Sequence, residues 1–293
     1  MFSQLIVSGF LTGSVYALMA LGIVVIYKAS SVFNFAHGSI VAFTAYLIWS
    51  FVVQLHLNPL LAGILCLLVI GIISFLVQRL ILYPLTGQPV LAALMATLAL
   101  GEVVSGFVTL MWPGPARTYP DFLPSGLIRL GPATITLGEI VNFVVCTLAF
   151  GAFVLFFQKS RLGLTMRGTA EDHQLARSEG VRVNRIFILA WFIAILMAGI
   201  GGFLMAFMHG VNQEPLISLG MKSLAVVILG GMESISGAVI GGLAIGVLEA
   251  LGAGYLDPIF GGGVEEVFPF VILLVVLMIR PYGLFGYERI ERV

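Results

Sequence analysis

Long apolar segments recur from one end of the chain to the other. They cover residues 5–27, 36–55, 60–82, 90–112, 138–157, 188–209, 235–254 and 266–280, and a shorter segment covers 219–232. A bilayer core of about 30 Å needs roughly 20 apolar residues per helix. These segments do not alternate as the strands of an outer-membrane barrel do. The pattern predicts an all-α fold, a polytopic transmembrane helix bundle of eight or nine membrane segments.

Glycines interrupt and space these segments. Gly230 and Gly231 end the short one and are followed by Glu233 and Ser234, which predicts a short or broken helix. A broken helix is tolerated in a membrane where its freed backbone groups face protein or a water-lined cavity. Elsewhere glycines stand four residues apart, a spacing that lets helix backbones approach closely in lipid. These pairs are Gly9 with Gly13, Gly237 with Gly241, and Gly242 with Gly246.

The two halves of the chain echo one another. A long span, a polar element with asparagine and a helix rich in small residues occur around 15–46 and again around 196–231. Such an echo is typical of inverted-repeat transporters, whose substrate sites lie where the repeats meet.

Composition agrees with a membrane location for the whole chain. Hydrophobic residues make up 60% and charged residues 10%, against roughly 25% charged residues in a soluble domain. We therefore expect residues 1–293 to form one transmembrane domain.

The formal net charge is zero, so no nucleic acid partner is expected. The two cysteines, Cys66 and Cys146, lie inside apolar segments and are expected to pack there rather than form a disulfide.

The distribution of basic residues predicts the orientation of the chain. Lys and Arg concentrate in short cytoplasmic loops, and six of the fourteen fall in the connection at about 158–187. They are Lys159, Arg161, Arg167, Arg177, Arg182 and Arg185. The connection is therefore predicted to be cytoplasmic. The C-terminal Arg280, Arg289 and Arg292 share that side if 219–232 crosses completely, and a re-entrant hairpin at 219–232 is the alternative.

Four charged side chains lie in or beside the spans, where charge is costly and commonly functional. They are Glu102, Lys222, Glu233 and Glu249. We predict that they line a substrate pathway together with Ser234. The competing interpretation is structural, because Glu102 or Glu249 could pair with a neighbouring helix and Lys222 could extend to the interface.

The polar element from Asn34 to Gly38 separates the first two spans. It predicts an unwound start to a helix, with Asn34 available to hydrogen-bond freed backbone and with Phe35 and His37 beside the pathway. His37 could ligate a metal or relay protons, but no second ligand stands at metal-binding spacing. A neutral, hydrogen-bonded histidine is therefore favoured, and no metal site is predicted.

The cytoplasmic connection carries a helix-start pattern. Thr169 followed by Asp172 forms a capping box, which predicts a helix from about Ala170 to Glu179 that Gly180 ends. A helix this short is marginal alone in water, so it needs a docking surface. A solvated connector is the alternative.

Two absences narrow the function. The chain has no G-x-x-x-x-G-K-[ST] phosphate loop, and no nucleophile with a plausible base can be assembled from its loops. An enzyme is therefore not predicted.

Four patches together resemble the permeases of the high-affinity branched-chain amino acid ABC transporter family. They are NFAHG (34–38), RLGLTMRGTAEDHQLARSEG (161–180), the Gly-rich stretch 222–249 and RPYGLFG (280–286). The resemblance implies a permease in a bacterial inner membrane that translocates branched-chain amino acids or similar small polar solutes. It also implies a second, related permease or a second copy, two cytoplasmic ATPases that use ATP-Mg, and a periplasmic or tethered solute-binding protein. This chain itself would bind no cofactor.

By the same resemblance, the connection is a coupling loop that docks in a cleft of an ATPase subunit. Its coupling residues would be Arg167, Thr169, Glu171, Asp172 and Gly180. One departure is Glu233, where the family commonly has glycine. A stand-alone channel or ion-coupled transporter for a small solute such as urea, an amide or an amino acid remains the alternative hypothesis, motivated by Glu102 and Glu249.

Overall fold

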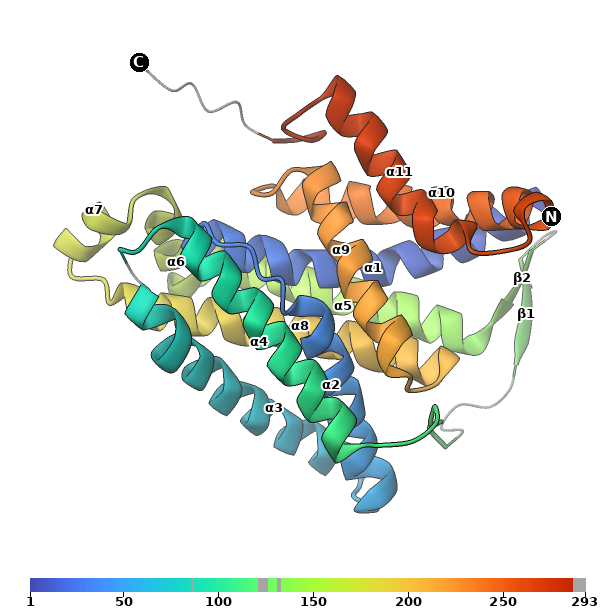
Figure 1. Cartoon of the computed structure of the whole chain (residues 1–293), viewed down its shortest axis with the longest axis horizontal. Coiled ribbons are helices and arrows are strands. Elements are labelled where there is room, and N and C mark those ends of the chain that lie inside the picture. Colours follow the sequence, from blue (N-terminus) through green and yellow to red (C-terminus); the bar gives the residue numbers. More distant parts are fainter. Residues whose placement is uncertain (86, 121–125, 131–132, 287–293) are drawn as a thin grey trace. The chain divides into compact units, whose positions relative to one another are not determined.

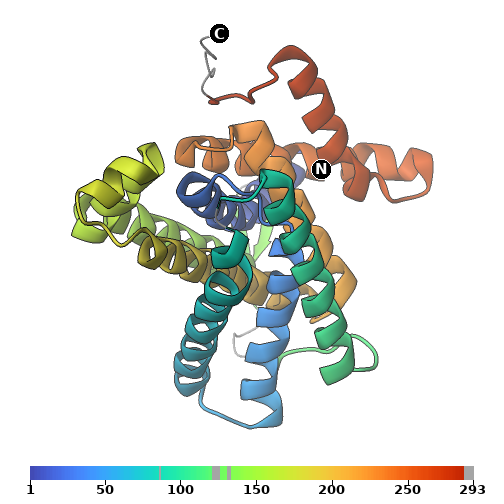
Figure 2. The ribbon, with the colours of Figure 1, turned by 60° about the vertical axis from the view of Figure 1, so that its left-hand side comes forward.

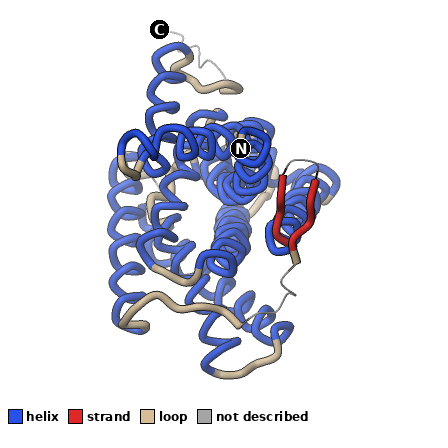
Figure 3. Tube along the Cα trace, turned by 90° about the vertical axis from the view of Figure 1, so that its right-hand side faces the viewer, coloured by secondary structure: helices blue, strands red, loops and turns tan. Residues whose placement is uncertain are grey.

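The structure is a computed structural model that describes residues 1–85, 87–120, 126–130 and 133–286. Within these residues the helices are joined by loops, and the only strands form one short hairpin (Figures 1 and 3). The predicted all-α class is confirmed. Arg289 and Arg292, which entered the orientation count, lie outside the described residues.

Each of the nine apolar segments forms a helix. Seven helices in the described part of the chain are long and apolar enough to cross a membrane. They are α1 (Phe2–Ser30), α2 (His37–Trp49) with its π-helical extension to Gln54, α3 (Pro59–Leu76) with its extension to Leu85, α4 (Val90–Met111), α5 (Leu137–Lys159), α8 (Val183–His209) and α10 (Ile235–Phe260). The other two are α9 (Gln213–Gly230) and α11 (Val264–Ile279). The segment placed at 219–232 thus begins earlier, at Gln213, because polar residues form its first turns.

Two features were not predicted by the apolar pattern. Strands β1 (Leu127–Leu130) and β2 (Ala133–Thr136) pair antiparallel, with Leu127 opposite Thr136 (Figure 3). The connection at about 158–187 contains two helices rather than one, α6 (Arg161–Glu171) and α7 (His173–Ser178).

Residues 25–120 and 148–220 form one compact unit, called unit 2 here. In it α2 packs against α4, α3 and α8, and Figure 2 shows α2, α3 and α4 side by side. Glycines permit close contact, since a Cβ at Gly202 of α8 would lie 2.7 Å from the carbonyl oxygen of Val41.

Residues 1–24, 121–147 and 221–293 contribute the other unit, unit 1. Here the first part of α1 packs on α10 through the glycines that the spacing singled out. A Cβ at Gly246 would lie 2.4 Å from the Cα of Gly13, and a Cβ at Gly13 would lie 2.7 Å from the carbonyl oxygen of Gly242. The predicted close approach of glycine-spaced helices is confirmed. Cys66 and Cys146 are buried free thiols, as expected.

Candidate functional site

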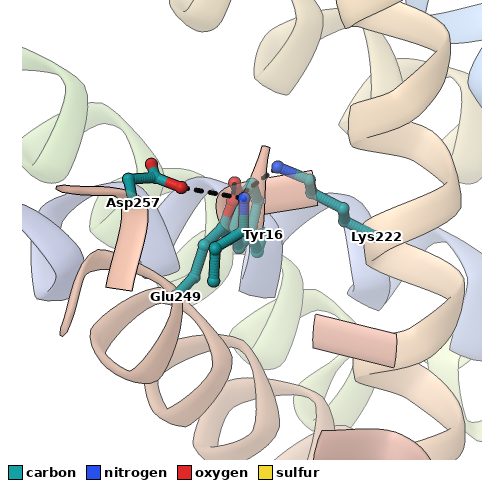
Figure 4. A network of polar contacts seen from close by, with 5 residues as sticks. Tyr16, Lys222, Glu249 and Asp257 are labelled. Atoms are coloured by element: carbon teal, nitrogen blue, oxygen red, sulfur yellow. Dashed lines mark hydrogen bonds and ion pairs between the residues drawn. The ribbon is translucent and has the colours of Figure 1, made fainter. Parts of the chain in front are cut away.

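Three side chains from three helices meet in the interior of unit 1 (Figure 4). The Lys222 ammonium of α9 lies 2.5 Å from the Oε1 atom of Glu249 in α10. The Tyr16 hydroxyl of α1 donates a 3.1 Å hydrogen bond to the same oxygen. The charged side chains are only 6% and 5% exposed. We call this group the Lys222–Glu249–Tyr16 network.

The network answers two questions that the sequence left open. Lys222 does not extend to an interface, because it is buried against Glu249. Glu249 does pair with a neighbouring helix, as the structural interpretation held. Opposite charges that lie this close compensate much of the desolvation that each would suffer alone. In Figure 4, Asp257 belongs to a separate contact, in which its Oδ1 atom accepts the Val264 N–H at 2.8 Å and joins α10 to α11.

The predicted helix break follows α9. Gly231 adopts φ +102°, and Ser234 caps α10 by accepting the Gly237 N–H at 2.9 Å. Glu233 is half-buried beside this cap. The broken helix is therefore confirmed, with Ser234 as its restart.

A later segment of the chain forms hydrogen bonds with the end of α9 at the break. The N–H of Leu284 donates to the carbonyl oxygen of Leu229 at 2.8 Å, and that of Phe285 donates to Gly230 at 3.1 Å. These bonds satisfy carbonyls that a helix end leaves free. The RPYGLFG patch thus closes the C-terminus of α9, a role that its sequence alone did not suggest.

The Asn34 element forms the bend between α1 and α2 in unit 2. The Asn34 side chain is 1% exposed, and its Oδ1 atom accepts the Ala36 N–H at 3.1 Å. The predicted role of Asn34 in binding freed backbone is confirmed. Thr97 of α4 also holds the bend, because its hydroxyl donates to the Phe33 carbonyl at 3.1 Å and accepts the Phe35 N–H at 3.4 Å. Threonines within spans are common, so no sequence signal marked Thr97.

His37 begins α2 and is buried at 1% exposure. Beside it, Gly38 approaches α9 so closely that a Cβ on Gly38 would lie 2.5 Å from the Ile217 carbonyl oxygen. The bend is therefore packed tightly against the start of α9. Glu102 differs from these residues, because it lies on the exposed side of α4 and contacts no hydrogen-bond or ion-pair partner among the described residues.

Helices α6 and α7 start differently from the capping-box prediction. Thr169 lies inside α6 and is fully buried, whereas Asp172 is the residue that caps α7. Its Oδ1 atom accepts the N–H groups of Gln174 at 2.7 Å and Leu175 at 2.9 Å. The prediction of a single helix opened by Thr169 is wrong, because α6 starts earlier, at Arg161, where the Ser160 side chain caps it by accepting the Gly163 N–H. Gly180 ends this region with φ +81°, as predicted.

Contacts within unit 2 hold α6 and α7 in place. The Arg167 guanidinium donates to the Phe157 carbonyl oxygen and lies 5.6 Å from the centre of the Phe157 ring. The His173 ring meets Phe187 of α8 edge to face at 5.5 Å. Glu171 and Asp172 remain exposed. Arg167 and Thr169 therefore stabilise this pair of helices, and Glu171 and Asp172 are the acidic groups it presents outward.

The cap predicts a pH dependence for α7. The N–H groups of Leu175 and Gln174 hold the pKa of Asp172 below its usual value. A carboxyl with a lowered folded-state pKa stabilises the fold above its unfolded pKa of about 3.9, and that contribution disappears as pH falls through the lower folded value. We expect the protection of the amides in 173–178, measured as the exchange rate relative to the intrinsic rate at the same pH, to be constant near neutral pH and to fall only in strong acid. In D172N the acid dependence should vanish while the cap persists; unchanged acid dependence in D172N would assign it to another group.

Comparison with known proteins decides the family. The sequence profile described as "Branched-chain amino acid transport system / permease component" matches residues 5–279. The chain belongs to this family. Its members include BraD of Pseudomonas aeruginosa, a "high-affinity branched-chain amino acid transport system permease protein", which is 30% identical over 99% of this chain and 97% of its own length.

Other relatives agree over the whole length of the permease. LivH of Escherichia coli K12 is 29% identical, with 100% of this chain and 98% of that protein covered. A probable LivH of Methanocaldococcus jannaschii is 29% identical over 92% of this chain and 88% of its own length. Among solved structures, PsaBC from Streptococcus pneumoniae in complex with Fab matches with a TM-score of 0.51 and 15% identity, covering 94% of this chain and 91% of that one. The permease is thus a multi-pass membrane protein, and this last likeness shows its fold.

Proposed function

We propose that the permease translocates branched-chain amino acids, or small polar solutes of similar chemistry, as the membrane subunit of an ATP-driven importer. Family membership over residues 5–279 supports this proposal. The observation that carries the ATP-driven part is the helix pair α6–α7, which lies in the connection richest in basic residues. Contacts of Arg167 and Thr169 hold this pair in place, and the pair presents Glu171 and the capping residue Asp172 outward. A solvated connector would not require such contacts.

The assembly follows from this proposal. Membership of the family implies that the permease works within a transport complex. The proposed partners are two cytoplasmic ATPases that use ATP-Mg, a second permease subunit or second copy, and a solute-binding protein outside the cytoplasm. The connection at 158–187 would lie in the cytoplasm, and its α6–α7 edge would dock on one ATPase.

The residues proposed for the pathway fall into two groups: residues at helix interruptions, and Glu102 on the exposed side of α4. Asn34, Phe35 and His37 shape the α1–α2 bend, while Glu233 and Ser234 mark the α9–α10 break, and both are places where a helix backbone is interrupted. Such interruptions are tolerated where they face protein or a water-lined path. Glu102 is exposed on α4, where a carboxylate facing lipid would be costly. We propose that the solute passes along the exposed face of α4.

Lys222 and Glu249 fit a different role in the same pathway. They are buried and bonded to each other, so their charges are not presented to a solute. We propose that they fix α9 relative to α10, and thereby hold the α9–α10 break in position. Their pairing also weakens the alternative of ion-coupled transport, for which Glu249 was one of the two motivating carboxylates.

The coupling role of α6–α7 has a direct test. Replacing Asp172 by alanine removes both cap and charge, whereas D172N keeps a cap of equal quality without the charge. We expect D172A to reduce solute uptake and solute-stimulated ATP hydrolysis severalfold in the reconstituted complex, and D172N to retain more activity. E171Q tests the neighbouring charge alone. Wild-type uptake in D172A and in the E171A/D172A double variant, with normal membrane insertion, would remove the coupling role.

Reconstitution separates the importer from the alternative. The permease alone in liposomes should show no solute flux under an ion gradient, and flux should appear only with the ATPase subunits and ATP. Solute flux driven by an ion gradient through the permease alone would favour the stand-alone transporter.

A further inference from the structure

An apolar groove runs along the outer surface of unit 2 between α3 and α8. Its volume is about 680 Å³. Leu68, Gly71, Ile72 and Phe75 of α3 line it together with Phe192 of α8. The α3 span has the highest mean hydropathy of the seven candidate spans, 3.0, and only 28% of it is buried. Side chains of this kind favour lipid tails as neighbours.

Gly71 opens the middle of the groove. A Cβ at this position would lie 3.9 Å from the Phe192 ring, which is ordinary van der Waals distance. Glycine is therefore not required there by crowding within the chain. Its effect is to leave a notch between α3 and α8 that a larger side chain would fill.

Two arginines follow a contact that joins the extension of α3, beyond Phe75, to the start of α8. The Gln78 side chain donates a 3.1 Å hydrogen bond to the Asn184 side chain, so this end of α3 lies beside the start of α8. Arg79 and Arg185 directly follow these two bonded residues, and both are exposed. In the described part of the chain neither arginine pairs with a carboxylate. Arg79 lies 5.2 Å from the centre of the Tyr83 ring, and aromatic and basic residues together are typical of the membrane–water interface.

We propose that this groove binds one phospholipid with an anionic headgroup. An acyl chain would occupy the notch at Gly71 and lie along Ile72 and Phe75, and the phosphate would lie between Arg79 and Arg185. An apolar groove with two exposed arginines beyond one end, neither paired with a carboxylate among the described residues, complements a lipid at both of its ends. Basic pockets between transmembrane helices are established sites for acidic lipid headgroups.

The test uses native mass spectrometry of the full permease in mild detergent, titrated with phosphatidylglycerol or phosphatidylethanolamine. We expect one tightly held lipid and a preference for phosphatidylglycerol. Each arginine should contribute about fivefold to that preference, so R79Q/R185Q should bring the two lipids to similar affinity. G71L should weaken both lipids, because leucine fills the notch. G106L is the control, because Gly106 lies on α4, does not line the groove and has open space around it.

Two results would overturn the proposal. One is equal affinity of the wild-type permease for the two lipids, or affinities that R79Q/R185Q and G71L leave unchanged. The other comes from a photo-crosslinking residue at Phe75 in the complete complex in membranes. A lipid adduct is expected, and an adduct to a protein subunit would assign the groove to subunit packing. Size-exclusion profiles that match wild type establish that each variant is folded.

Discussion

Replacing Lys222 by methionine should lower the free energy of unfolding of the permease by about 3–5 kcal/mol, because it leaves the Glu249 carboxylate buried without its cation. The remaining hydrogen bond from Tyr16 compensates only part of that loss. Methionine keeps the unbranched shape of the lysine stem, so the effect reports the charge rather than a cavity. Thermal or detergent-induced unfolding of purified protein measures it.

A double-mutant cycle identifies the pair as the cause. E249Q alone leaves a buried lysine, but K222M/E249Q removes both charges while glutamine can still accept the Tyr16 hydroxyl. We expect the double variant to be more stable than K222M alone, since neutral replacement of a buried pair is often nearly neutral. Destabilisations that simply add in the double variant would show that Lys222 and Glu249 do not act as a pair.

The second large effect is expected at Gly246. Alanine there would place its Cβ 2.4 Å from the Cα of Gly13 and 2.4 Å from the carbonyl oxygen of Gly9. Both neighbours are backbone and cannot rotate away, so α1 and α10 must separate. Overpacking of this kind costs about 1–3 kcal/mol, and the loss should appear as a lower unfolding temperature of G246A.

Gly106 of α4 supplies the matched control. It has open space around it, and alanine is favoured over glycine inside a helix by roughly 0.5–1 kcal/mol. G106A should therefore be as stable as wild type or slightly more so. Equal stability of G246A and G106A would contradict the close contact between α1 and α10.

Local patterns in the sequence determined much of the fold. All nine apolar segments are helices in the structure. The hydropathy and length of each segment were enough to predict this, because both are properties of the segment alone. The backbone cap by Asn34, the break at Gly231 and the close approach at Gly13 and Gly246 were also visible. Each depends on a property of one or two residues: a short polar side chain, a positive φ, or a missing Cβ.

The boundaries of some helices could not be predicted from the sequence. The start of α9 at Gln213 and the continuation of α6 through Thr169 both run through polar sequence that resembles a connection. In each case the helix is stabilised by what it packs against, so propensity and capping signals within the segment could not place its end. Asp172 was predicted to lie in the first turn of a helix capped by Thr169, whereas it is itself the cap of the later and shorter helix α7.

Only the tertiary structure decided which polar groups meet. Glu249 lies 27 residues from Lys222 and 233 from Tyr16 in the chain, and nothing in the sequence of any one helix determines which face it turns toward another. The same holds for Thr97 at the α1–α2 bend and for the arginines beyond one end of the α3–α8 groove. Hydropathy is a property of a segment and can be read along the chain, whereas a pairing is a property of helix rotation and packing, which arise only when the segments assemble.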